Sequence, residues 1–403
     1  MARIVYVGVP AHGHTNPTIG VVKRLVARGH EVLYYNAEPF RPKLAGTGVE
    51  FHAYPEPMPT EREISEALYE FVNASLLFSR LSRHLTGAIL DEMRRLRPDL
   101  ILYDSAAMWG YVAGRALAIR HVALFTHFVL GGALRTIGLR PLARFLRTAL
   151  PHLPELVGWR REMTRRFGRG IAGGLTEYGD GNLVFTSRQF HPQSAILDNP
   201  RFRFVGASFE AGRPEDARPL GIQQGERVVY VSLGTVNSLD PTFYRAAFEA
   251  FADHPGRVVL SAGTHTDLGA LAPWPANFVV APFVPQLAVL ACADAFVTHG
   301  GLNSVHEALV HGVPMVVVPH QLEQLLNGRR VAVTGTGVLR GGTPPYGRVT
   351  ATGLRDALAQ ILGDPRYGVN AARFGKTLID AGGPARAADY IEDQLSRSRQ
   401  AGA

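Results

Sequence analysis

The segment FVTHGGLNSVHEALVHGVPMVVVPHQLEQ, residues 296–324, places small and polar residues where phosphate can bind. An apolar run is followed by a turn that contains Gly300 and Gly301. Asn303 and Ser304 are then suited to cap a helix. The first amide N–H groups of a helix have no partner inside the helix and lie at its positive end, so they bind anions. The segment therefore predicts a site for an activated small molecule that carries phosphate.

Three further polar side chains belong to the same predicted site. Glu307 lies three residues after Ser304, so it either closes a capping box or points from the first helical turn toward a ligand. Glu323 and Gln324 follow the next apolar run. Because parallel strands end at one edge of a sheet, we expect these side chains near the phosphate.

The sequence does not predict a metal site. It has no D-x-D pair, and no group of histidine, cysteine and carboxylate residues has the spacing of metal ligands. The phosphate charge must then be met by the helix end, by His299 and by backbone donors. We expect neither a metal nor any other cofactor.

A second set of residues can move a proton. The turn PAHGHTNP, residues 10–17, carries His12 and His14 directly after the first predicted strand, and Asp104 follows the strand 100–103. A carboxylate that orients a histidine holds one tautomer and stabilises the imidazolium, so such a pair can act as a general base. The alternative is structural: the histidines are hydrogen-bonded in a turn and Asp104 caps a helix. The two roles can coexist.

Other motifs are weaker or missing. Thr235 in VSLGT can donate a hydrogen bond to phosphate, although such short strings are common. Phe283, Val284 and Gln286 follow a proline-fixed turn, where an aromatic ring can stack on a base; the alternative is an ordinary loop. The absence of G-x-G-x-x-G after the first strand argues against a dinucleotide-dependent oxidoreductase, and hydrolase and P-loop motifs are missing too.

Composition is that of a soluble globular protein with 46% hydrophobic and 19% charged residues. No apolar run is long enough to span a bilayer, the first residues read as a strand rather than a signal peptide, and Cys292 is the only cysteine. We therefore expect a cytoplasmic location. Much of the net charge of +8 comes from nine arginines in residues 135–169. A solvent-exposed helical face explains these arginines better than binding to a membrane surface does, and binding to nucleic acid explains them least well.

The 403 residues suggest two or three domains, and strands alternate with helices in two series. This alternation predicts two doubly wound, parallel α/β domains that face a central cleft. Predicted strands lie at 4–8, 31–35, 100–103, 122–125 and 183–186, and then at 228–233, 258–261, 278–280, 295–298 and 315–318. We expect an N-terminal domain at 1–205, a linker at 206–226, a C-terminal domain at 227–383 and a last helix at 384–403.

These motifs, in this order, resemble family 1 glycosyltransferases of the GT-B fold. The resemblance runs through PAHGHTNP, YDSAAMWG, VSLGT, PFVPQLAVL, THGGLNSVHEAL, PHQLEQ and AGGPARAADYIE, and so covers nearly the whole chain. It is greatest to the bacterial macrolide-type branch, whose members glycosylate hydrophobic natural products from UDP-sugars. The resemblance implies that the last helix returns to the N-terminal domain.

The resemblance also implies a role for each matching residue. His14 matches the general base and Asp104 the acid that orients it. The implied donor contacts are His299, Gly301, Asn303 and Ser304 to phosphate, Glu307 to the ribose hydroxyls, Glu323 and Gln324 to the sugar hydroxyls, and Phe283, Val284 and Gln286 around the base. Phe283 stands where plant members carry tryptophan, and Glu323 stands where aspartate is frequent, which leaves the exact sugar open.

The expected function is transfer of a sugar, with inversion, from a UDP-sugar to a hydroxyl of a hydrophobic acceptor such as a macrolide, flavonoid or other polyphenol. Glucose is the sugar that we expect above others. Phe128 and Trp159 are the candidate acceptor contacts, because an apolar and arginine-rich segment surrounds them. Two alternatives are a nucleotide-sugar-binding protein without activity and a nucleotide-sugar epimerase of the same fold. His14 and Asp104 argue against the first, and the apolar segment argues against the second.

Overall fold

The computed structural model describes residues 1–68, 71–129, 147–168, 178–192, 198–209, 220–223, 225–234, 241–263, 266–342 and 348–402. Thr235 and most of the predicted linker lie outside these ranges. The chain forms two compact units. Unit 1 contains Met1–Glu210 and Ala381–Ala403, and unit 2 contains Ala211–Asp380.

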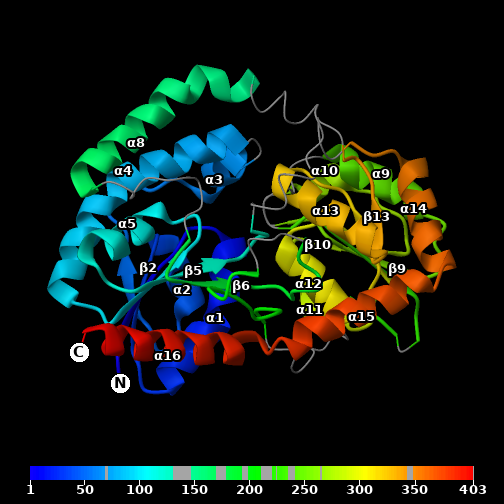
Figure 1. Ribbon diagram of the computed structural model, residues 1–403. Coiled ribbons are helices and arrows are strands. Elements are labelled where there is room, and N and C mark those ends of the chain that lie inside the picture. The colour runs from blue at the N-terminus through cyan, green and yellow to red at the C-terminus, as the bar shows by residue number, and fades with distance from the viewer. Residues whose placement is uncertain are drawn as a thin grey trace. The chain divides into compact units, whose positions relative to one another are not determined.

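Unit 1 is built on a sheet with the strand order β3-β2-β1-β4-β5-β6-β7. Figure 1 labels β2, β5 and β6 of this sheet. All its neighbouring strands are parallel. The strands are β1 (Arg3–Val7), β2 (Glu31–Asn36), β3 (Glu50–Ala53), β4 (Leu100–Asp104), β5 (His121–Phe125), β6 (Gly181–Val184) and β7 (Phe202–Phe204). The helices are α1 (His12–Ala27), α2 (Arg41–Leu44), α3 (Glu61–Leu68), α4 (Phe71–Leu96), α5 (Met108–Leu117), α8 (Leu153–Phe167) and α16 (Gly383–Gly402), with short 3₁₀ turns at Glu38–Phe40 and Leu150–His152.

Unit 2 has a second parallel sheet, ordered β10-β9-β8-β11-β12-β13. Its strands are β8 (Val228–Ser232), β9 (Arg257–Ser261), β10 (Phe278–Ala281), β11 (Ala295–Thr298), β12 (Met315–Val317) and β13 (Gly337–Leu339). Its helices are α9 (Pro241–Phe251), α10 (Leu268–Leu271), α11 (Gln286–Leu290), α12 (Leu302–Val310), α13 (Leu322–Thr334), α14 (Ala351–Gly363) and α15 (Arg366–Asp380). The predicted fold class, two parallel doubly wound α/β domains, is confirmed.

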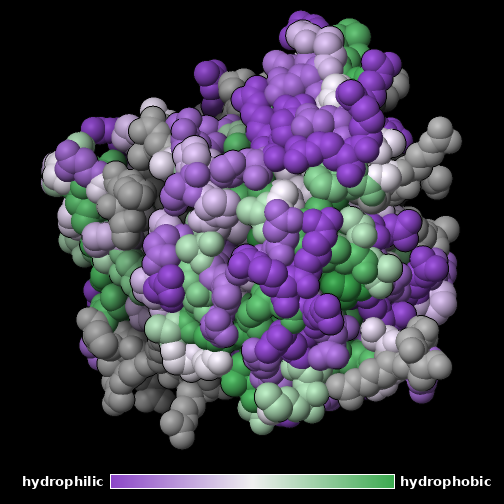
Figure 2. Space-filling model, turned by 90° about the vertical axis from the view of Figure 1, so that its left-hand side faces the viewer, coloured by the Kyte–Doolittle hydropathy of each residue, from purple (hydrophilic) through white to green (hydrophobic). Residues whose placement is uncertain are grey.

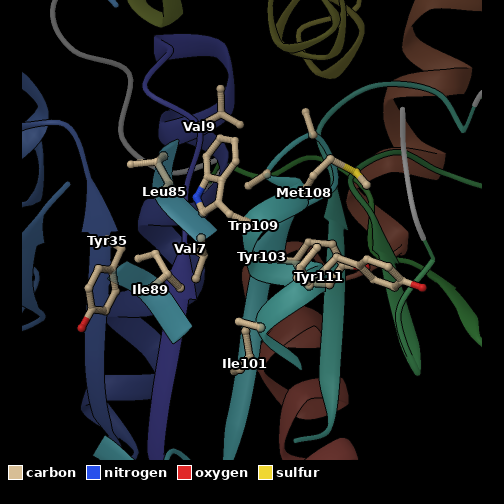
Figure 3. Packing of buried hydrophobic residues seen from close by; sticks show 14 of the residues in the cluster. Val7, Val9, Tyr35, Leu85, Ile89, Ile101, Tyr103, Met108, Trp109 and Tyr111 are labelled. Carbon is tan, nitrogen blue, oxygen red and sulfur yellow. The ribbon is translucent and has the colours of Figure 1, made fainter. Parts of the chain in front are cut away.

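Alternating strand residues of unit 1 build a separate core on each face of the sheet. On one face, Val7 and Ile101 pack with Leu85 and Ile89 of α4 and with Trp109 of α5 (Figure 3). The Trp109 indole is fully buried, and its N–H donates to the Tyr54 hydroxyl at 3.0 Å. Full burial of an aliphatic side chain such as Leu85 or Ile101 contributes roughly 1.5–3 kcal/mol, so these cores hold the strand ends in place.

The other face of the same sheet is covered by α1 and α16. Ala387, Ala388 and Ile391 of α16 are fully buried against strand residues such as Ile4. Arg28, at the end of α1, adds ion pairs to Asp389 at 2.7 Å and to Glu392 at 2.6 Å. The last helix therefore folds as part of unit 1, although it follows unit 2 in the sequence.

The first helix begins earlier than its sequence indicates. The pattern predicts a turn at residues 10–17 and a helix from Pro17, whereas α1 starts at His12 and contains Pro17. Ala11 precedes it in an extended conformation, with φ −142° and ψ 140°. As a result, His14 is held on a helical turn rather than in a loop.

Within the described residues, no helix is long and apolar enough to cross a membrane. Figure 2 shows hydrophilic residues over much of the face that it presents, with smaller hydrophobic areas between them.

Candidate active site

His14 and Asp104 form a close pair at the carboxyl edge of the unit 1 sheet. The Nδ1 atom of His14 lies 2.7 Å from Oδ2 of Asp104. Asp104 is fully buried at the end of β4, and its Oδ1 accepts the Ala106 backbone N–H at 2.9 Å. The two residues meet because β1, which leads into α1, is the neighbour of β4. The His14 side chain stays 18% exposed, so it can reach a ligand.

Two residues that the sequence does not single out complete this pair. Thr126, directly after β5, places its hydroxyl 3.1 Å from Nδ1 of His14. The next residue, His127, lies 3.0 Å from the Ser105 hydroxyl through Nε2 and 2.9 Å from the Phe128 carbonyl through Nδ1. Burial lowers the pKa of His127, and the nearby His14 lowers it further. Burial thus disfavours a charged ring at His127, next to His14.

His12, the other histidine of the predicted turn, has different surroundings. Its ring packs against Phe40 with the ring centres 5.1 Å apart. The two histidines thus have different neighbours, and it is His14 that lies against Asp104.

In unit 2, helix α12 starts at Leu302 with Gly301 as its N-cap. The predicted caps Asn303 and Ser304 are wrong, because both lie inside the first turn and no side chain caps this helix. The two residues before the helix are glycines for different reasons. Gly300 has φ +85°, which side chains rarely allow, and a Cβ at Gly301 would lie only 2.5 Å from Nε2 of His299. The first N–H groups of α12 thus stay without an intrahelical partner, as a phosphate site requires.

Glu307 belongs to a buried hydrogen-bond network instead of a capping box. The Gln286 side-chain amide donates to Glu307 and, at 3.2 Å, to the Ser304 hydroxyl. The Tyr230 hydroxyl donates in turn to the side-chain oxygen of Gln286 at 3.0 Å. Burial raises the pKa of Glu307 to about 7, and the bond from Gln286 opposes that rise. The predicted capping box is wrong, whereas three predicted donor residues do come together here.

His299 follows β11 and is packed between glycine backbones. A Cβ at Gly234 would lie 2.8 Å from its ring. Burial lowers the pKa of His299 to about 4, and the neighbouring His320 adds to this effect. At neutral pH the ring is therefore uncharged in this structure, and it can meet phosphate as a hydrogen-bonding group rather than as a cation.

Glu323 and Gln324 lie in the first turn of α13. Glu323 is exposed, and its carboxylate accepts a hydrogen bond from Asn327 at 2.7 Å. Asn327 also donates to the Gly300 carbonyl at 2.8 Å, so it ties α13 to the glycine turn before α12. Gln324 is 4% exposed, and its side-chain oxygen accepts the backbone N–H of His320 at 2.8 Å. Asn327 was not predicted from sequence, but a polar residue one turn after Glu323 is a usable signal.

Comparison with known proteins decides the family. A family model described as "Erythromycin biosynthesis protein CIII-like, C-terminal domain" matches residues 248–393. The demethyllactenocin mycarosyltransferase of Streptomyces fradiae is 32% identical, with 98% of this chain and 87% of that protein covered. The NDP-glycosyltransferase YjiC of Bacillus subtilis (strain 168) is 30% identical over 98% of both chains. The crystal structure of the kitacinnamycin glycosyltransferase has a TM-score of 0.83 and 30% identity, covering 98% of this chain and 99% of that one.

The chain belongs to the family 1 glycosyltransferases. The predicted resemblance to the bacterial, natural-product members of this family is confirmed, as are the GT-B fold and the enzyme class. A nucleotide-sugar donor and a small-molecule acceptor follow at the level of the family.

The glycosyltransferase presents the predicted base-binding residues in contrasting ways. Phe283 is 71% exposed, which is unusual for an aromatic side chain and leaves its ring open to stacking. Val284 is 1% exposed, so it can offer a ligand only its backbone. Contact of these residues with the base stays a prediction.

The predicted acceptor residues are buried in this structure of the glycosyltransferase. Phe128 is 2% exposed and packs against Phe190 and His191. Trp159 of α8 is 8% exposed and belongs to the core that contains Leu85 and Ile89 of α4. Here both side chains have a packing role rather than the open, ligand-facing one that the sequence suggested. Their contact with an acceptor stays a prediction.

The raised pKa of Glu307 predicts that the glycosyltransferase becomes less stable as pH rises toward 7. An unfolded glutamate ionises near its usual pKa of 4.5, whereas folded Glu307 keeps its proton until about pH 7. Between these values the native chain binds more protons, so its stability falls as pH rises. Glutamine does not titrate, so the free energy of unfolding of E307Q relative to wild type should rise by up to about 3 kcal/mol across this range. Urea unfolding of both proteins at a series of pH values measures this difference in the free energy of unfolding. A difference that does not change with pH would contradict the prediction.

Proposed function

We propose that this glycosyltransferase moves glucose from UDP-glucose to a hydroxyl of a hydrophobic natural product, with inversion at the anomeric carbon. The observation that carries the proposal is the 2.7 Å pair of His14 and Asp104 at the carboxyl edge of the unit 1 sheet. Binding a nucleotide sugar needs no such pair, whereas removing a proton from an acceptor hydroxyl does.

The proposed reaction is a single displacement. Nδ1 of His14 lies against Asp104, which leaves Nε2 as the atom that takes the acceptor proton. The acceptor oxygen then bonds to the anomeric carbon, and the bond from that carbon to UDP breaks with its electron pair on UDP. Asp104 stabilises the imidazolium that results. General-base catalysis of this kind contributes about 10²–10⁴-fold in rate, or roughly 3–5 kcal/mol of barrier.

The donor side of the proposal rests on unit 2. The N–H groups at the start of α12 and the neutral ring of His299 are proposed to stabilise the charge that grows on UDP. Glu307 is proposed to hold the ribose hydroxyls, and Glu323 with Gln324 the hydroxyls of the sugar. One relative is named for transfer of mycarose and another for NDP-sugars in general, so donors other than UDP-glucose are included in the test.

Product analysis tests the proposed substrates. The enzyme is incubated with UDP-glucose and, in turn, with macrolides, flavonoids and simple phenols, and the products are analysed by mass spectrometry. We expect several acceptors to gain one hexosyl group. If UDP-glucose gives no product while a dTDP-sugar does with the same panel, the proposed donor is wrong.

Transfer is expected to continue in EDTA. In the proposed mechanism the leaving UDP is stabilised by backbone N–H groups and His299, so a chelator removes nothing that the reaction uses. Initial rates with and without EDTA should agree within error. Complete inhibition that Mg²⁺ reverses would contradict this account of the leaving group.

The two alternatives considered from the sequence are not favoured. The relatives from Bacillus subtilis, Streptomyces antibioticus and Streptomyces fradiae are named as an NDP-glycosyltransferase, an oleandomycin glycosyltransferase and a mycarosyltransferase, which supports sugar transfer.

A further inference from the structure

A cavity of about 110 Å³ lies in unit 1 beside α16. Its charged lining consists of Arg120, Arg201, Arg203, Arg397, Asp180 and Asp393. Arg120 and Asp180 directly precede β5 and β6, and Arg201 directly precedes β7. The cavity is therefore at the amino edge of the sheet, opposite the carboxyl edge that carries Asp104.

Positive charge exceeds negative charge in this cavity. Asp393 forms an ion pair with Arg397 at 3.0 Å, and Asp180 lies 3.2 Å from the His121 ring. Within the described part of the chain, no acidic side chain pairs with Arg120, Arg201 or Arg203. Four arginines and two aspartates line the cavity, so its lining keeps an excess of positive charge.

Neutral groups hold two of the arginines in place. Arg120 donates twice to the carbonyl oxygen of the Gln394 side chain, at 3.0 and 2.7 Å. The guanidinium of Arg203 lies over the Tyr390 ring, 5.8 Å from its centre. Such contacts orient a cation without cancelling its charge, and little side-chain freedom is left to lose when an anion binds.

The shape of the cavity depends on close packing of α16. Tyr390 donates its hydroxyl hydrogen to the Arg201 carbonyl at 3.0 Å. A Cβ at Gly181 would lie 2.7 Å from that hydroxyl oxygen, so only glycine lets the helix come this close. Burial raises the pKa of Tyr390, whereas Arg203, Arg120 and Arg397 act to lower it. Arg120, Arg203 and Arg397 thus all lie close enough to the Tyr390 hydroxyl to act on it electrostatically.

We propose that this cavity is a second ligand site, which binds a small phosphate-class anion apart from the donor and acceptor sites. Guanidinium groups match phosphate oxygens with paired N–H donors, and three arginines without acidic partners supply several such donors. Free phosphate esters and phosphate-bearing lipid headgroups share this chemistry. The proposal does not depend on the proposed transfer reaction, because all the residues that carry it belong to unit 1.

Calorimetry with the full chain tests the site. Inorganic phosphate is titrated at constant ionic strength into protein saturated with UDP, so that phosphate cannot compete for the predicted donor site. The test variant is R201Q/R203Q. The matched control, R160Q/R161Q, removes the same charge from two exposed arginines of α8. Thermal unfolding of both variants checks that they fold as the wild type does.

We expect saturable binding of one phosphate per chain, at least tenfold weaker in R201Q/R203Q and unchanged in R160Q/R161Q. A parallel sedimentation assay uses vesicles of phosphatidylcholine with and without phosphatidic acid. Capture by the phosphatidic acid vesicles that only R201Q/R203Q loses would support the site and identify a lipid headgroup as its source. The proposal is overturned if neither probe binds in a saturable way, or if both double variants lose binding equally.

Discussion

Replacing His14 with alanine is expected to lower kcat for transfer by about 10²- to 10⁴-fold, the usual contribution of a general base. The affinity for UDP should stay at the wild-type value, because the predicted donor residues belong to unit 2 and His14 belongs to unit 1. Initial rates and calorimetry with UDP on the same preparation measure the two effects.

His12→Ala is the matched control for this variant. It removes an imidazole two residues earlier in α1, where the ring packs against Phe40 rather than Asp104. We expect its kcat to stay within a few-fold of wild type. If H14A kept half of the wild-type activity, or if both variants lost the same amount, His14 would not be the base.

Glu307→Ala is expected to weaken UDP binding by tenfold or more. Hydrogen bonds to a charged group contribute roughly 1.5–3 kcal/mol each, and the ribose offers two hydroxyl donors to one carboxylate. UDP affinity of the wild type should also strengthen as pH rises through about 7, because the carboxylate that accepts these bonds forms only there. Calorimetry at several pH values measures both effects.

Glu323→Ala is the counterpart in the same unit, since its proposed partners are on the sugar. It should raise KM for UDP-glucose and leave UDP binding unchanged. Glu249→Ala, an exposed glutamate of α9, controls for loss of charge alone. Equal effects of the Glu307 and Glu323 changes on UDP binding would remove the proposed division between ribose and sugar contacts.

The central strands of both sheets could be predicted from sequence, and three edge strands could not. Every predicted strand overlaps an observed one, because central parallel strands are buried on both faces and appear as apolar runs. The strands missed are β3, β7 and β13, each at the edge of its sheet. Arg203 in β7 and both terminal residues of β3 are exposed, so their sequences lack an apolar run. β13 begins at Gly337, a residue that sequence patterns assign to turns.

The site could be predicted where residues follow a strand end and could not where packing decides. The closeness of His14 and Asp104 was predictable because His14 comes after β1 and Asp104 ends β4, and neighbouring parallel strands bring such residues together. The caps of α12 were wrong because Gly301, rather than a polar side chain, allows the close approach of His299. The neutral state of His299 and the raised pKa of Glu307 come from burial, which no local pattern reports.

The anomeric configuration of the product tests the central claim most directly, because one displacement assisted by His14 must invert the reacting carbon. The product formed from α-linked UDP-glucose is purified, and the coupling of its anomeric proton is measured by NMR. A β-glucoside is the result that the mechanism predicts. An α-glucoside would contradict it, since retention requires either two displacements or attack from the face that UDP leaves.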